Sequence, residues 1–184
     1  MTGMRTIAVL LAFLVPVPVD AQDLDWVRDW ENAQRARPAS IASVARIAPA
    51  SEKGTPMVVH GRAIGKDGKP APGVIVFAYQ TDATGVYNVR NARGWRLRGW
   101  AKSDTQGRFE FRTIRPGSYP GSRNPAHIHI TIDGPRLPRR WAEEVNFRDD
   151  PFVSASSKTA LPVTTREGVQ HVNYTIRIAD RGRF

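Results

Sequence analysis

The sequence contains no cysteine. This absence excludes a disulfide-stabilised scaffold, a zinc ribbon, an iron–sulfur protein and a thiol nucleophile. Any metal site must therefore use nitrogen and oxygen ligands. After Pro38 the sequence also has no helical pattern of any length, and no glycine-rich loop leads into a helix, so nucleotide binding is not expected.

Acidic residues are few compared with basic ones. The chain has 17 Asp and Glu against 27 Lys and Arg, a net charge of +10. Because the basic residues are spread along the chain without a Lys/Arg-rich run or a recognised motif, we expect no nucleic-acid partner. The length of 184 residues, with 41% hydrophobic and 24% charged residues, indicates one globular domain with room for a leader.

Residues 1–21 have the pattern of a secretory signal peptide. A positive charge at Arg5 precedes an apolar stretch from Ile7 to Val15, which is too short to span a bilayer. Val19 and Ala21 provide the small residues that signal peptidase accepts, so we expect cleavage after Ala21. We expect the mature chain to be exported to a bacterial periplasm or the extracellular space, with no stable membrane insertion.

Residues 22–56 are predicted to form an N-terminal helix and a linker arm. Within Asp23 to Arg37, Trp26 and Trp30 are four residues apart and so lie on one side of a helix. We expect both indoles to pack against the main domain rather than to stack on a ligand. Residues 40–56 are rich in Ala, Ser and Pro and are typical of an ordered arm.

Residues 57–180 are predicted to form a β-sandwich. Short segments rich in β-branched and aromatic residues alternate with turn dipeptides, which is typical of an all-β domain. The predicted strands are Met57–Ile64, Gly73–Gln80, Arg108–Thr113, Ala126–Ile132, Glu143–Phe147 and Val169–Ile178. Because no helix is available to cover them, the strands must pack on strands, and we expect a two-sheet immunoglobulin-like sandwich.

The sharpest candidate for chemistry is His127-Ile128-His129. Side chains two apart in a strand leave the same face, so both imidazoles can approach one metal ion while Ile128 enters the core. Two histidines lining a solvated sheet face would give the same pattern. We expect His60 and His171 to be surface or packed residues rather than ligands.

Two tyrosines lie in Gly- and Pro-rich loop contexts, Tyr87 after Asp82-Ala83-Thr84-Gly85 and Tyr119 in Pro116-Gly117-Ser118-Tyr119. Such rings usually pack, with the hydroxyl bonded to backbone. A tyrosinate at neutral pH needs a strong Lewis acid beside it, because the free phenol has a pKa of about 10. The residues alone thus leave three readings open: a ferric site, a His pair holding zinc with a carboxylate for hydrolysis, and a metal-free module that binds carbohydrate or protein.

A series of short motifs extends from Met57 to Val153. They are Gly61-Arg62-Ala63, Asp67-Gly68-Lys69-Pro70, Asp82-Ala83-Thr84-Gly85-Val86-Tyr87, Asp104-Thr105-Gln106-Gly107-Arg108-Phe109, Pro116-Gly117-Ser118-Tyr119-Pro120, Pro125-Ala126-His127-Ile128-His129 and Val145-Asn146-Phe147. Together they resemble the intradiol ring-cleavage dioxygenases, the family of protocatechuate 3,4-dioxygenase and catechol 1,2-dioxygenase. Several of the motifs also occur in metal-free sandwich modules, whereas the histidine motif with both upstream tyrosines is specific to the site.

The resemblance implies a non-haem Fe(III) enzyme with iron ligands Tyr87, Tyr119, His127 and His129. It implies that Tyr119 is the tyrosinate that leaves the iron and takes a substrate proton. The reaction implied is cleavage of a catechol-type ring between its two hydroxyls by O2, giving a cis,cis-muconate-type diacid.

The chain also departs from the family pattern. Well-known members have an arginine three residues before the first histidine, where this chain has Asn124, with Arg123 one step earlier. Arg123 is therefore our candidate for the catalytic arginine. The spacing of eight residues from Tyr119 to His127 is shorter than in those enzymes and suggests a more open mouth. The sequence is compatible with a homo-oligomer.

Overall fold

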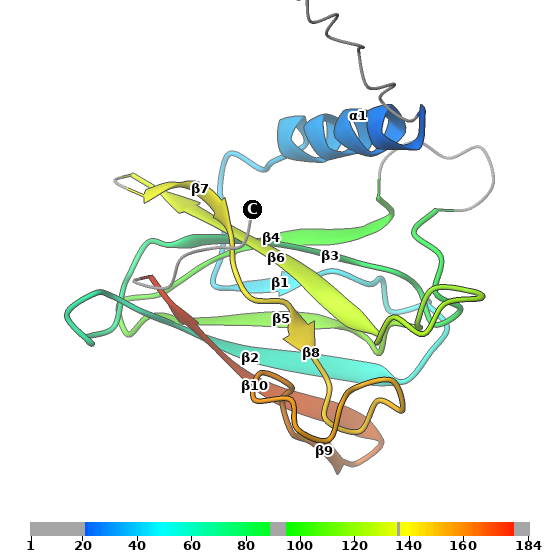
Figure 1. Ribbon diagram of the computed structural model, residues 1–184. Helices are drawn as coiled ribbons and strands as arrows, with labels where there is room; N and C mark the ends of the chain where they lie inside the picture. The colour runs from blue at the N-terminus through cyan, green and yellow to red at the C-terminus, as the bar shows by residue number, and fades with distance from the viewer. Residues whose placement is uncertain (1–20, 89–94, 136, 179–184) are drawn as a thin grey trace, which may run out of the picture.

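The structure is a computed structural model that describes residues 21–88, 95–135 and 137–178, with side chains from residue 26 onward. The predicted signal peptide lies almost entirely outside these ranges. The described chain forms one helix and ten strands (Figure 1). They are α1 Ala21–Arg35, β1 Val44–Arg46, β2 Pro56–Ile64, β3 Ile75–Gln80, β4 Leu97–Lys102, β5 Arg108–Ile114, β6 His127–Gly134, β7 Leu137–Trp141, β8 Val145–Asn146, β9 Val163–Arg166 and β10 Val169–Arg177.

The strands form two sheets that pack face to face. One sheet has the order β1-β5-β2-β10-β9, and the other has the order β4-β3-β6-β7 with β8 paired to β6. We call them the outer sheet and the site sheet. The prediction of an all-β two-sheet sandwich with a short N-terminal helix is confirmed.

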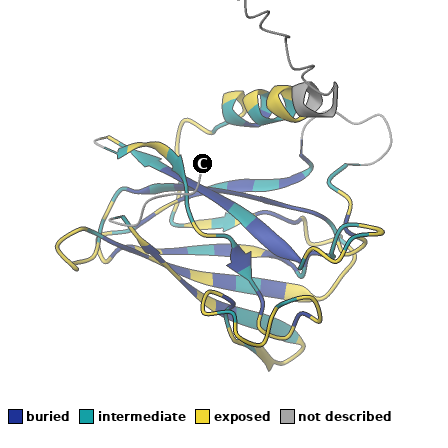
Figure 2. Ribbon diagram, viewed as in Figure 1, coloured by how far each residue is buried: buried dark blue, intermediate teal, exposed yellow. Residues whose placement is uncertain are grey.

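The core lies between the sheets and follows the alternation of the strands. In β5, Phe109 and Phe111 point inward and are almost fully buried, while Arg108 and Arg112 are exposed. Ile128 of β6 is buried in the same core, as expected from the sequence. Figure 2 shows the contrast between this buried layer and the exposed loops at its ends.

Helix α1 covers the face of the site sheet that points away from the core (Figure 1). The ring of Trp30 contacts Phe77 of β3 edge-on, with centroids 5.7 Å apart. Because β3 has the core on one face and the helix on the other, its residues from Val76 to Gln80 are all buried. Among the described helices none is long and apolar enough to cross a bilayer.

Four of the ten strands are not among those predicted. Strand β1 lies inside the expected linker arm and pairs in parallel with β5 through only three residues. Strand β7 contains the exposed residues Pro138 and Arg139, a composition found at sheet edges. The strand expected at Glu143–Phe147 is reduced to the two residues of β8, while β4 and β9 were not anticipated.

Candidate metal centre

Four side chains meet at one end of the site sheet, on the face that α1 covers. The hydroxyl of Tyr87 lies 2.5 Å from that of Tyr119 and 2.8 Å from Nε2 of His129. The Tyr119 hydroxyl is 3.2 Å from Nε2 of His127 and 3.3 Å from Nε2 of His129, and these two nitrogens are 3.0 Å apart. The structure therefore brings together all four residues that the sequence singled out as ligands.

The two tyrosines are on neighbouring loops that follow β3 and β5. Gly85 has a φ of +84°, and a Cβ at this position would lie 1.9 Å from the carbonyl oxygen of Ser118. A Cβ at Gly117 would lie 2.5 Å from the carbonyl oxygen of Ala83. Only glycine allows the two backbones to approach this closely, so the glycines set the separation of the tyrosine rings.

A buried amide fixes the strand ends from which both loops begin. Gln80, the last residue of β3, accepts a hydrogen bond from Thr113 Oγ1 at 2.8 Å and donates one to the carbonyl of Ile114 at 3.0 Å. These bonds link the two sheets, since Thr113 and Ile114 end β5. Asp82 then shapes the first loop by accepting hydrogen bonds from the backbone of Thr84 and Val86.

The two imidazoles are oriented through their other ring nitrogens. Nδ1 of His127 lies 2.6 Å from the carbonyl oxygen of Pro125, and Nδ1 of His129 lies 2.8 Å from Oε1 of Glu144. Because both partners accept hydrogen bonds, each Nδ1 carries the proton and each Nε2 presents its lone pair to the tyrosine hydroxyls. This is the tautomer that a metal-binding histidine needs.

The electrostatics favour neutral side chains when no ion is bound. Burial raises the pKa of the Tyr87 hydroxyl, and its hydrogen bond with Tyr119 raises it further. Burial also raises the pKa of Tyr119, although the hydrogen bond with Tyr87 opposes this shift. Burial lowers the pKa of His129, against the effect of Glu144. A strong positive charge is needed to convert these phenols to tyrosinates.

The arrangement fits a single hard metal ion. Ligand atoms about 2 Å from one ion and at right angles to each other are about 3 Å apart, which matches the separations of the four donor atoms. Ligand atoms of His127, His129 and Glu144 also lie within 4.8 Å of one another, the set a zinc site would use. Glu144, however, contacts His129 at Nδ1 and not at the nitrogen that faces the tyrosines.

A hollow of about 390 Å³ opens beside the centre. It is lined by Trp26, Tyr79, Tyr87, Tyr119, His129, Trp141 and Glu144. Tyr79 is almost fully buried and stacks on the imidazole of His129, with centroids 4.4 Å apart. The hollow therefore joins the metal-ligand cluster to an aromatic rim.

Arg123 and Glu144 differ in their relation to the centre. Arg123 is exposed, with its guanidinium carbon 5.6 Å above the ring of Phe152, and it is not among the residues lining the hollow. Glu144, in contrast, lies in the centre. Its contact with His129 depends on the tertiary structure, and no local motif indicates it.

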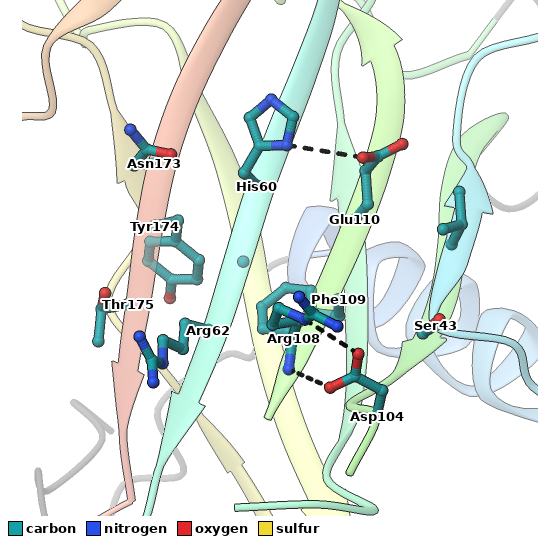
Figure 3. Close-up of a pocket in the computed structure, with 12 residues that line it drawn as sticks. Ser43, His60, Arg62, Asp104, Arg108, Phe109, Glu110, Asn173, Tyr174 and Thr175 are labelled. Atoms are coloured by element: carbon teal, nitrogen blue, oxygen red, sulfur yellow. Dashed lines mark hydrogen bonds and ion pairs between the residues drawn. The ribbon is translucent and has the colours of Figure 1, made fainter. Parts of the chain in front are cut away.

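The other two histidines are far from this centre. His60 of β2 is exposed and His171 of β10 is half-buried, and their Nε2 and Nδ1 atoms are 3.0 Å apart on the outer sheet. Figure 3 shows the carboxylate of Glu110 beside the His60 ring, in a shallow hollow of about 480 Å³. They form a surface pair, in keeping with the expectation that neither belongs to the metal centre.

Comparison with known proteins agrees with this geometry. A dioxygenase family model matches residues 34–173. The chain is 28% identical over 144 residues to catechol 1,2-dioxygenase 1 of Acinetobacter lwoffii, covering 64% of this chain and 46% of that protein. It is 38% identical over 104 residues to 6-chlorohydroxyquinol 1,2-dioxygenase of Cupriavidus pinatubonensis, covering 45% and 37%.

Solved structures show the same fold. The dioxygenase domain of a dioxygenase carbohydrate-binding protein fusion from Streptomyces sp. SirexAA-E superposes with a TM-score of 0.62 at 25% identity, covering 76% of this chain and 90% of that one. The chain spans about half or less of the length of the curated relatives above. Since the family model covers most of the sequence, the chain belongs to the intradiol ring-cleavage dioxygenase family.

Proposed function

We propose that this protein is a non-haem ferric dioxygenase that cleaves catechol-type rings between the two hydroxyls. The observation that carries the proposal is the convergence of Tyr87, Tyr119, His127 and His129 with donor atoms 2.5 to 3.3 Å apart. Two phenolic oxygens are suited to a hard, highly charged ion such as Fe(III). Membership of a family that is generally iron-dependent supports the same metal.

When bound, ferric iron supplies the Lewis acid that holds a catecholate and makes its ring reactive toward O2. The side chains of the protein accept protons, hold the ion and limit the access of water to the centre. Tyr119 borders the hollow, and we assign to it the role that the family resemblance implies, to take a proton from an incoming catechol. Tyr87 and both histidines hold the ion in place. Tyr79 stacks on the His129 ring and covers one of its faces.

The overall reaction needs no external reductant. Both oxygen atoms of O2 enter the product, the bond between the two hydroxyl-bearing carbons breaks, and each of these carbons becomes a carboxylate. The electrons come from the catechol ring itself. Accordingly the chain needs no binding site for a nicotinamide or flavin, and its substrates are a catechol and O2.

The visible absorption spectrum of the purified protein, with metal analysis of the same sample, tests this proposal. We expect bound iron, a red colour from tyrosinate-to-iron charge transfer, and conversion of catechol to a muconate. His129→Ala should lose the iron and Tyr119→Phe should change the colour and reduce turnover, whereas His60→Ala on the outer sheet should change neither. A protein that stays colourless after iron is added in air would support the metal-free binding module, and bound zinc would support a hydrolase.

We further propose that the protein acts after export from the cytoplasm. The support is the leader sequence alone, with its short apolar stretch and the small residues before Gln22. The intact mass of protein recovered from a bacterial periplasm or culture medium tests this. A chain that begins at Gln22 is the expected result, and one that keeps the leader in the cytoplasm contradicts it.

A further inference from the structure

The hollow beside the metal centre is larger than one catechol ring requires. Its volume of about 390 Å³ is in the range of pockets that take drug-sized ligands, about 300–1,000 Å³. A catechol held at the tyrosine and histidine end would fill only part of it. The rest of the hollow is bounded by Trp26 of α1 and Trp141 of β7.

Trp26 is held in place at this rim. Its indole packs against Trp95, with ring centroids 5.8 Å apart, and Trp95 in turn stacks on Tyr79 at 3.7 Å. The indole also stacks on Trp30 at 5.9 Å. Its orientation is therefore set before any ligand arrives, which reduces the entropy lost when a ligand binds.

Despite these contacts, Trp26 keeps 42% of its surface exposed. Trp30, one turn later on the same helix, is half-buried and packs against Phe77 and Trp141. The expectation that both indoles serve only to dock the helix thus fits Trp30. Trp26 instead presents part of its apolar ring to the hollow, next to Trp141 at 6.2 Å.

The chemistry of the rim selects among possible substituents on the catechol. Indole and phenol rings bind another aromatic ring by offset stacking or edge-on contact. Among the described residues that line the hollow none is a lysine or arginine, so no described cation is placed to hold a carboxylate substituent. The rim is thus suited to a second, uncharged aromatic ring.

We infer that Trp26 and Trp141 form a subsite for an aryl substituent, so the favoured substrates are catechols that carry a second aromatic ring. This inference rests on the proposed ring-cleaving function for the position of the catechol. A pocket that fits only one ring would exclude substrates of this class. The subsite also gives helix α1 a role in substrate binding in addition to covering the site sheet.

The test measures binding and turnover separately, with catechol and 4-phenylcatechol as the two probes. Binding is measured by calorimetry without O2, and turnover is measured in air. The variant is Trp26→Ala, and the matched control is Val27→Ala, the next residue of α1, which is equally exposed at 44% and does not line the hollow. 4-tert-Butylcatechol, whose substituent is bulky but not aromatic, distinguishes the effect of ring stacking from the effect of substituent size.

We expect the wild-type protein to bind 4-phenylcatechol more tightly than catechol or 4-tert-butylcatechol. Trp26→Ala should weaken binding of 4-phenylcatechol about fivefold, the scale of one aromatic contact, and leave catechol within twofold. Trp26→Phe should restore part of the loss, and Val27→Ala should have no effect.

Two results would overturn the inference: no preference for the two-ring probe in the wild type, or equal losses for both catechols in Trp26→Ala. Failure of the proposed function would give a different result from failure of this inference. In that case no muconate forms in air, while the binding preference and its dependence on Trp26 are still measured in the calorimeter.

Discussion

At the scale of single residues, Glu144 determines how one of the two imidazoles is held. Its carboxylate lies 2.8 Å from Nδ1 of His129, whereas His127 has only a backbone carbonyl at the same position. A carboxylate behind a ligating histidine fixes the ring and makes its other nitrogen a stronger donor. The two histidines of the centre are therefore not equivalent, and His129 is the stronger ligand.

Replacing Glu144 with Gln should weaken this effect without emptying the space. The amide oxygen still accepts the proton of Nδ1 but carries no charge, so less electron density reaches the iron. We expect iron affinity to fall about tenfold, at the lower end of the effects of such partners. The tyrosinate-to-iron absorption band should move to longer wavelength, because the iron becomes a better electron acceptor.

Glu143→Gln is the matched control for Glu144→Gln, since the neighbouring side chain is exposed and does not line the hollow. Iron titration and the absorption spectrum of both variants are the measurements. If the two variants behave alike, the carboxylate does not act on His129 and the asymmetry argued above is wrong.

At the scale of elements, the two tyrosine loops act as one unit because their glycines allow close contact. Gly85→Ala places a methyl group against the Ser118 carbonyl and also strains a backbone with positive φ. Gly68, in the turn between β2 and β3, has a similar φ of +75° but open space around it. Comparing Gly68→Ala with Gly85→Ala therefore distinguishes the effect of backbone strain from the effect of steric overlap between the two tyrosine loops.

We expect Gly68→Ala to lower the free energy of unfolding by about 1–2 kcal/mol, the strain alone, and to leave iron binding intact. Gly85→Ala should destabilise more and should also lose iron, because the loops must separate and carry Tyr87 away from Tyr119. Urea unfolding and iron content measure the two effects. Iron binding by Gly85→Ala at the level of Gly68→Ala would show that the loop contact does not position the ligands.

The elements also show how far the sequence predicts this structure. Segments with clean alternation, such as Arg108–Thr113 and Ala126–Ile132, become β5 and β6 nearly as expected, because one face must be buried. The sequence does not predict strand β7, because it is an edge strand that contains a proline and an exposed arginine. The histidine pair follows from the two-residue repeat of a strand.

The rest of the centre depends on contacts that the residue pattern does not contain. The loop contexts of Tyr87 and Tyr119 leave their role open, since these loops have no periodicity, and only the family resemblance assigns both residues as ligands. Glu144 could not be found at all, because it reaches His129 only through the pairing of Val145 in β8 with Ile128 in β6. Similarly, Trp26 and Trp30 have the same helical signature, and only the packing of α1 distinguishes their surroundings.

At the scale of the whole molecule, the net charge favours anionic substrates, whereas the lining of the hollow favours neutral ones. The chain carries a net charge of +10, which attracts anions over long distances. The described lining of the hollow contains aromatic rings and the Glu144 carboxylate instead. An anionic catechol such as protocatechuate would therefore encounter the protein faster than a neutral one, whereas contacts inside the hollow favour neutral rings.

Salt separates these two contributions. Raising the ionic strength from about 0.01 M to 0.15 M shortens the screening length from about 30 Å to about 8 Å, which removes long-range attraction and leaves contacts in the hollow largely intact. We expect kcat/KM for protocatechuate to fall severalfold over this range, while the value for neutral catechol stays nearly constant. The ratio of the two, measured with the iron-loaded protein at pH 7, is the decisive quantity. If the ratio does not change with salt, the positive charge of the molecule has no role in choosing its substrate.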